Sequence, residues 1–132
     1  MKTTILGAAL AVMALATAAH AQTSKPASAP GAGRQCFRTS QVDNYTSTND
    51  EQTLYVRSGR AIFKIDFGNR CTGLAFRQTI VLKSVGASNL ICAPIDLDFG
   101  VRDTGIYTRC IATDMHALTP DEIAALPKKL KP

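Results

Sequence analysis

Two β-type runs in the middle of the chain, residues 53–57 and 61–67, constrain its fold more than any other feature. They flank Ser58-Gly59-Arg60, and a short glycine-containing connection between such runs is typical of a β-hairpin. In the second run Phe63, Ile65 and Phe67 alternate with other residues, so these three side chains share one face of a strand. The pattern predicts an antiparallel hairpin whose apolar face enters a core.

The first residues have the form of a secretory signal peptide. Lys2 precedes an apolar stretch over residues 5–16, and Ala19-His20-Ala21 has the small-x-small form that signal peptidase cleaves. The apolar stretch is shorter than the roughly 20 residues that a membrane-spanning helix needs. No cysteine follows it directly, which argues against a lipoprotein. We therefore expect cleavage after Ala21 and a periplasmic or secreted product without a membrane span.

The remaining chain divides into a linker and one domain. Residues 22–34 are rich in Ser, Ala, Pro and Gly and carry no large apolar side chain, which predicts a flexible linker. Residues 35–132 have a usual length for a single domain with one core. The domain boundaries are therefore expected at 1–21, 22–34 and 35–132.

Four cysteines lie in this domain, and an even number in an oxidising compartment predicts two disulfide bonds. Their wide spacing lacks the Cys-x-x-Cys pairs of metal sites and redox centres. Three pairings are open, and we favour the nested one, which clamps the first and last segments of the domain together. It would join Cys71 to Cys92 and Cys36 to Cys110.

Further elements follow from local pattern. Residues 41–52 are polar and rich in turn formers, residues 71–76 are expected to form one helical turn or a bend, and residues 79–83 and 90–92 are expected to form strands. Ile95, Leu97 and Phe99 alternate with acids as in a half-exposed strand, and Asp103-Thr104-Gly105 predicts a hairpin turn that returns through residues 106–112.

The clearest helix signal comes near the end of the chain. Thr119 is followed by proline at the first helical position and by Glu122 at the capping-box position, which predicts a helix from Pro120 to about Leu126. The expected fold class is therefore mainly β: a small antiparallel sheet or barrel of about five or six strands, stapled by disulfides, with a short C-terminal α-helix.

This layout resembles an uncharacterised family of small exported proteobacterial four-cysteine proteins, known only as a domain of unknown function. The resemblance implies export and a shared cysteine frame, and it implies no activity. It covers nearly the whole domain and rests on these segments: Cys36-Phe37, Tyr55-Val56-Arg57, Cys71-x-Gly73-Leu74, Ile91-Cys92, Cys110, and Leu118-Thr119-Pro120 through Leu126.

Charge and titratable residues do not point to an enzyme or a nucleic-acid binder. The net charge is +5, but the arginines are scattered, and only Lys128, Lys129 and Lys131 cluster, on what we expect to be a solvated terminus. His116 has no identifiable serine or cysteine partner. We predict no catalytic residue, cofactor or metal. One alternative is a Ca²⁺ site or metal-dependent hydrolase built from these acids: Asp96, Asp98 and Asp103.

The best functional hypothesis is a small periplasmic binding or inhibitor-like module that acts by protein contact. Tyr55, Arg57 and Tyr107 are the candidate contact residues, because tyrosine and arginine are enriched at binding surfaces. An alternative is an envelope-associated structural or stress protein whose basic surface makes weak contact with anionic wall polymers. The first hypothesis predicts a protein partner, and the alternative predicts salt-sensitive association with the cell wall.

Overall fold

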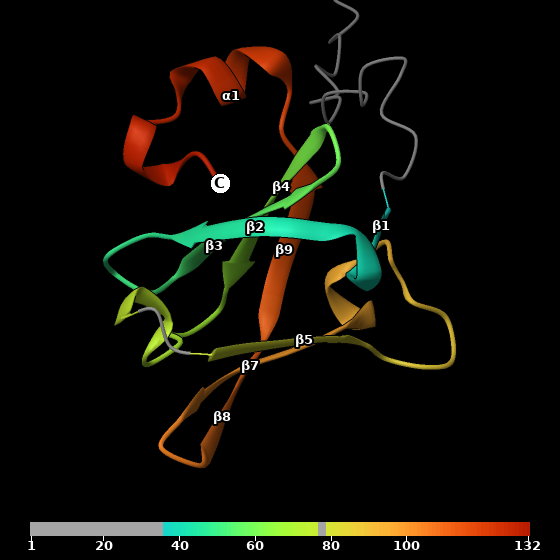
Figure 1. The fold of residues 1–132 in the computed structure, drawn as a ribbon, viewed down its shortest axis with the longest axis vertical. Helices are drawn as coiled ribbons and strands as arrows, with labels where there is room; N and C mark the ends of the chain where they lie inside the picture. Colours follow the sequence, from blue (N-terminus) through green and yellow to red (C-terminus); the bar gives the residue numbers. More distant parts are fainter. Residues whose placement is uncertain (1–35, 77–78) are drawn as a thin grey trace, which may run out of the picture.

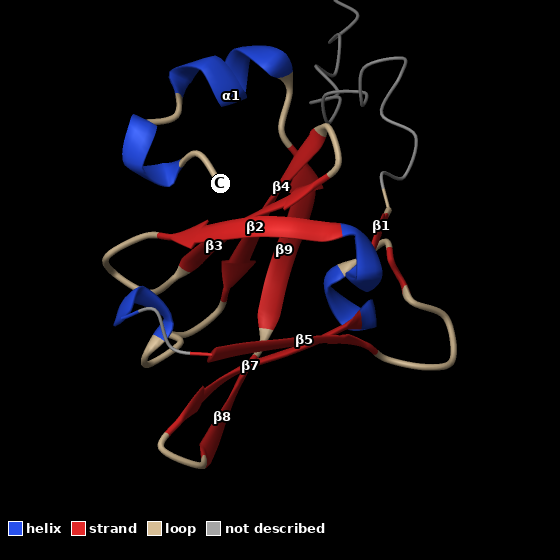
Figure 2. Ribbon diagram, viewed as in Figure 1, coloured by secondary structure: helices blue, strands red, loops and turns tan. Residues whose placement is uncertain are grey.

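The structure, a computed structural model, describes residues 36–76 and 79–132. The predicted signal peptide, residues 1–21, and linker, residues 22–34, lie outside the described residues. The described chain is mainly β, with three small antiparallel sheets and one short α-helix near the C-terminus (Figures 1 and 2). The strands are β1 (Phe37–Arg38), β2 (Val42–Ser47), β3 (Thr53–Ser58), β4 (Ala61–Phe67), β5 (Thr79–Ser84), β6 (Leu90–Ile91), β7 (Leu97–Asp103), β8 (Ile106–Cys110) and β9 (Ala112–Ala117).

The largest sheet has the order β2-β3-β4-β9 and contains the predicted hairpin as its two central strands. The register pairs Ser58 with Ala61 across the turn. Leu54, Val56, Phe63 and Ile65 are buried on the core face of these strands, which confirms the face predicted from alternation.

A second sheet has the order β5-β7-β8, and β1 pairs with β6 in a third. The hairpin of β7 and β8 closes through Thr104 and Gly105, whose φ angles of 43° and 89° are those of a two-residue turn that matches strand twist. This hairpin extends away from the four-stranded sheet at the lower end of Figure 1.

All three sheets contribute to one hydrophobic core. Buried side chains come from β1, β3, β4, β6, β7 and β8, and Leu74 joins them from the 3₁₀ turn η2 (Leu74–Phe76). Phe37 contacts Phe63 with ring centroids 4.8 Å apart, and Phe67 stacks on Phe99 at 5.0 Å. Because they share this core, the three sheets form a single packed unit.

The two disulfides join Cys36 to Cys92 and Cys71 to Cys110. The nested pairing predicted from the sequence is therefore wrong, and the bonds cross along the chain. The reason is strand register. Phe37 pairs with Ile91, so their neighbours Cys36 and Cys92 lie opposite each other. The number and spacing of the cysteines contain no information about that register.

Helix α1 (Pro120–Ala125) confirms the predicted helix and its capping box. The Thr119 hydroxyl accepts a hydrogen bond from the Glu122 N–H at 3.3 Å, and the Glu122 carboxylate accepts one from the Thr119 N–H at 2.7 Å. This second contact, together with the Thr119 hydroxyl, lowers the pKa of Glu122. A 3₁₀ turn, η4 (Lys128–Leu130), then brings the chain back toward β2.

The expected fold class, mainly antiparallel β with two disulfides and a short C-terminal helix, is confirmed. Its strands, nine among the described residues, are divided over three small sheets. Two local predictions need correction. Part of the segment expected to be turns, 41–52, forms β2, because a half-exposed edge strand tolerates polar residues. Ile95 belongs to the 3₁₀ turn η3 (Pro94–Asp96) and is 82% exposed, because the Asp96 carboxylate binds the Cys92 and Ala93 amides and ends the extended run there.

Candidate functional site

The candidate site is a groove along the outer edge of β2, the edge that faces away from β3. Among residues 36–76 and 79–132, no strand pairs with this edge. A hollow of about 480 Å³ lies against it, within the size range of ligand clefts. A second hollow of about 310 Å³ shares Asn44 and Tyr45 with the first and continues toward β5. We call the two hollows together the β2 groove.

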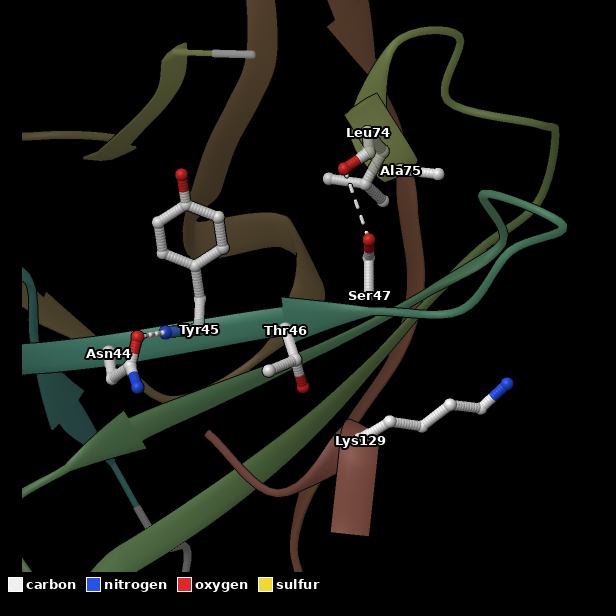
Figure 3. Close-up of a pocket in the computed structure, with 7 residues that line it drawn as sticks. All are labelled: Asn44, Tyr45, Thr46, Ser47, Leu74, Ala75 and Lys129. Carbon is white, nitrogen blue, oxygen red and sulfur yellow. Dashed lines mark hydrogen bonds between the residues drawn. The ribbon is translucent and has the colours of Figure 1, made fainter. Parts of the chain in front are cut away.

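Backbone groups of Tyr45 and Ser47 face the groove. The Thr48 N–H donates to the Thr53 carbonyl at 3.0 Å, which fixes the phase of the hydrogen-bond ladder between β2 and β3. In an antiparallel ladder alternate residues turn their N–H and C=O groups outward, so Ser47 and Tyr45 do so here. The Tyr45 N–H donates a hydrogen bond to the Asn44 side-chain oxygen at 2.9 Å, so this N–H points away from β3 (Figure 3).

The floor of the groove is apolar. Val42 and Tyr45 on β2 are half-buried and pack against the core, and so do Ile80 and Leu82 on β5. Because β2 and β5 are edge strands of different sheets, the core comes close to the surface between them. An extended segment placed here would pair with a strand edge and cover apolar side chains at once.

One wall of the groove is the turn η2, and Glu51 holds it in place. The Glu51 carboxylate accepts hydrogen bonds from the Gly73 N–H at 2.9 Å and the Ala75 N–H at 3.4 Å, and it pairs with Arg70 Nε at 2.6 Å. The Glu51 carbonyl also accepts from the Cys71 N–H at 2.8 Å. On the β2 side, the Ser47 hydroxyl donates to the Leu74 carbonyl at 3.0 Å (Figure 3).

Among the described residues, Glu51 is charged and yet fully buried, with 0% of its surface exposed. Burial by itself would raise the pKa of the Glu51 carboxyl, but the Arg70 guanidinium and the N–H groups of Ala75 and Gly73 outweigh burial and lower it. Glu51 also has a φ of 59°, a conformation that costs energy for a residue with a side chain. The hydrogen bonds of Glu51 therefore stabilise both its ionised carboxylate and its unusual backbone conformation.

The opposite wall is the C-terminal segment. The Thr46 hydroxyl donates to the Leu130 carbonyl at 2.7 Å, and Arg57 Nη1 donates to the Pro132 carbonyl at 3.0 Å. Figure 3 shows Lys129 on the same side of β2 as Asn44 and Thr46, while Tyr45 and Ser47 point to the side of Leu74. The exposed Lys129 ammonium at the rim gives this end of the groove a positive charge.

The structure separates the three predicted contact residues. Tyr55 is 7% exposed, and Arg57 is half-buried and bonded to the C-terminal segment, so both act within the chain in this structure. Tyr107 is 40% exposed on β8, where burial and the neighbouring Asp98 carboxylate raise the pKa of its phenol. The four cysteines named in the sequence analysis form the two disulfides described above.

The acids proposed for Ca²⁺ have separate roles. Asp96 caps η3, Asp98 pairs with Arg109 at 3.2 Å, and Asp103 lies at the far end of β7. Within the ranges described, no three His, Cys, Asp or Glu side chains are arranged to hold a metal ion. His116 Nδ1 contacts the Asp114 carboxylate at 2.9 Å.

A second polar cluster lies on the outer face of the four-stranded sheet. Register places Tyr55, Lys64 and His116 side by side, and they line a hollow of about 440 Å³ beneath α1. The Asp66 carboxylate raises the pKa of Lys64. Burial would raise the pKa of Asp66, but Lys64 at 2.7 Å and the Thr53 hydroxyl lower it. Lys64 is paired with Asp66 and His116 with Asp114, so these side chains already have partners within the chain. The β2 groove is therefore the better candidate site.

Comparison with known families identifies the family of the chain from its sequence. A family model described as a family of unknown function, DUF6491, matches residues 1–131. The chain belongs to DUF6491. No curated protein and no solved structure matches this DUF6491 chain. None of the helices among the described residues is long and apolar enough to cross a membrane.

Glu51 and β2 are the parts of the candidate site that sequence reasoning missed. Glu51 stands in a polar run that resembles a surface turn, and its partners are backbone amides around residue 73, far along the chain. No local pattern marks such a contact. The available signal was weak: Val42, Tyr45 and Thr46 are residue types enriched in strands, but they lie among polar residues without a period of two.

Proposed function

We propose that this protein is an exported binding module that recognises an extended segment of a partner protein along the β2 groove. The observation that carries the proposal is the outward-facing backbone of Tyr45 and Ser47 beside an apolar floor. Strand addition uses these two features together, since main-chain hydrogen bonds give affinity and alternate side-chain pockets give specificity.

The surroundings of the groove define the partner segment further. Its side chains that face Tyr45 and Leu74 would be apolar, and its end near Lys129 would be acidic, because the Lys129 ammonium lies at that rim. Asn44 already bonds the Tyr45 N–H, so a partner must displace this side chain. Asn44 therefore protects the edge from unspecific pairing.

Export belongs to the proposal and rests on the signal-like residues 1–21 and the two disulfides. Disulfides persist mainly in oxidising compartments such as the periplasm. The proteobacterial family that the chain resembles would place it there.

The test is in-cell photo-crosslinking of the exported protein with a photoreactive amino acid in place of Ala75, which lines the groove and leaves Lys129 unchanged. Ser47→Pro removes an outward N–H while leaving the ladder with β3 intact, and Ser47→Ala is the matched control that removes only the hydroxyl. We expect one protein to be captured by wild type and by Ser47→Ala, with roughly ten-fold less by Ser47→Pro. Equal capture by both variants, or no captured protein, would refute the proposal.

A second candidate function is weak binding to anionic wall polymers. The outer face of the β5-β7-β8 sheet carries Lys83, Arg102 and Arg109 on neighbouring strands, with Asp98 among them. This face would attract polyanions in a salt-dependent manner. Sedimentation with cell-wall material at low salt, lost at high salt and absent in an Arg102→Ala, Arg109→Ala variant, is the expected result.

A further inference from the structure

The outer edge of β8 offers a second set of backbone groups. Within the described ranges no strand pairs with this edge, and β8 belongs to the hairpin that extends from the molecule (Figure 1). Ile106 is 69% exposed and Tyr107 40% exposed, so apolar surface accompanies the edge. The Ile111 carbonyl accepts a hydrogen bond from the Gly68 N–H at 3.2 Å, which ends the accessible edge after Cys110.

The phase of the ladder shows which residues face outward. A two-residue turn at Thr104 and Gly105 makes Asp103 and Ile106 the first hydrogen-bonded pair. Alternation then directs the N–H and C=O groups of Tyr107 and Arg109 away from β7, while Thr108 between them bonds inward to Val101.

This edge is complementary to itself, and we propose that two copies of the chain associate by antiparallel pairing of β8 about a two-fold axis at Thr108. In that register Tyr107 of each copy lies opposite Arg109 of the other. All the outward N–H and C=O groups of both residues then form hydrogen bonds across the axis. A neighbouring register would leave some of these groups without a partner.

The side chains favour the same register. Tyr107 and Arg109 share the outer face of their sheet, so each guanidinium would meet the aromatic ring of the other copy. The Tyr107 ring is held over Gly100, where an added Cβ would lie 2.5 Å from the ring. Asp98 lies 3.2 Å from Arg109 and offsets the charge of the two arginines near the axis. Ile106 of each copy would lie opposite residue 110 of the other and lose exposed surface.

The association is tested by sedimentation velocity of the purified protein from micromolar to millimolar concentration. Arg109→Pro removes an outward N–H from each copy without touching the ladder to β7, and Arg109→Ala is the matched control that keeps this N–H. We expect a concentration-dependent dimer that Arg109→Pro weakens roughly 10- to 100-fold more than Arg109→Ala does. A wild-type monomer throughout the range, or equal effects of the two variants, would overturn the proposal.

A covalent readout does not depend on the proline variant folding. Thr108 would face its own copy across the axis as a non-hydrogen-bonded pair, with Cα atoms about 4.5 Å apart. This separation allows a disulfide. Thr108→Cys should therefore form a disulfide-linked dimer in air, mapped by peptide mass spectrometry, while Lys83→Cys on the other edge strand should not. Equal cross-linking of the two variants would overturn the proposal.

Discussion

The Glu51 carboxylate should be the most consequential single polar group for the stability of this domain. It is fully buried, receives two backbone N–H groups from the η2 wall and pairs with Arg70 at 2.6 Å. Glu51→Gln keeps an acceptor for Gly73 and Ala75 and loses the charged bond to Arg70, a kind of hydrogen bond worth about 1.5–3 kcal/mol. Arg70 is 63% exposed and stays solvated, so we expect a loss of about 2 kcal/mol.

Glu51→Ala should cost more, because the Gly73 and Ala75 N–H groups would lose their acceptor and a cavity would form. Each buried unsatisfied donor costs about 1–3 kcal/mol, and the 3.4 Å bond from Ala75 is the weaker of the two. The expected total is about 4 kcal/mol, a large share of the roughly 5–15 kcal/mol that stabilises a typical domain. Urea unfolding of wild type, Glu51→Gln and Glu51→Ala at about pH 7 measures both costs.

Acid should remove the difference between wild type and Glu51→Gln. The pKa of Glu51 is lower in the folded protein, so its contribution is fully present above the unfolded value and is lost as pH falls through the folded value. The two unfolding free energies should therefore converge as pH falls below about 4.3, where an unperturbed glutamate titrates, and on through the lower pKa of the folded state. Equal stabilities at neutral pH, or a gap that persists in acid, would refute the role given to this carboxylate.

Two further predictions concern covalent and local stabilisation. Peptide mapping of the oxidised protein should recover the crossed disulfides, and replacing either pair by alanine should cost up to about 4 kcal/mol by loop-closure arithmetic for separations of 56 and 39 residues. Recovery of a nested pair would contradict the structure. Thr119→Ala should lower unfolding free energy by about 1 kcal/mol through loss of the α1 cap, whereas the exposed Asp121→Ala should change it far less. Similar melting temperatures for the two variants would contradict the capping contribution.

Local sequence signals were sufficient wherever one segment forms its own structure. The alternation around Phe63 and Ile65 predicted the central hairpin, and Thr119 with Glu122 predicted α1, because the determining contacts lie within a few residues. The turn at Asp103-Thr104-Gly105 followed for the same reason. The mainly β class could therefore be predicted without long-range information.

Features set by long-range pairing could not be predicted in this way. Crossed disulfides depend on the register that places Cys36 beside Cys92, and β2 is a strand because β3 offers it a partner edge. The role of Glu51 depends on amides more than twenty residues away in the chain. These long-range contacts create the β2 groove, so the candidate site could not be predicted from local sequence patterns.

The central claim is that a partner segment pairs with the outer edge of β2. Amide hydrogen exchange of the protein alone and with its captured partner tests this most directly, with Ser47 as the reporting amide and Thr46, which bonds inward to β3, as the internal control. The account predicts that the Ser47 amide exchanges quickly alone and becomes strongly protected in the complex, while Thr46 is protected in both. Protection that instead appears along β8, with Ser47 unchanged, would contradict the claim.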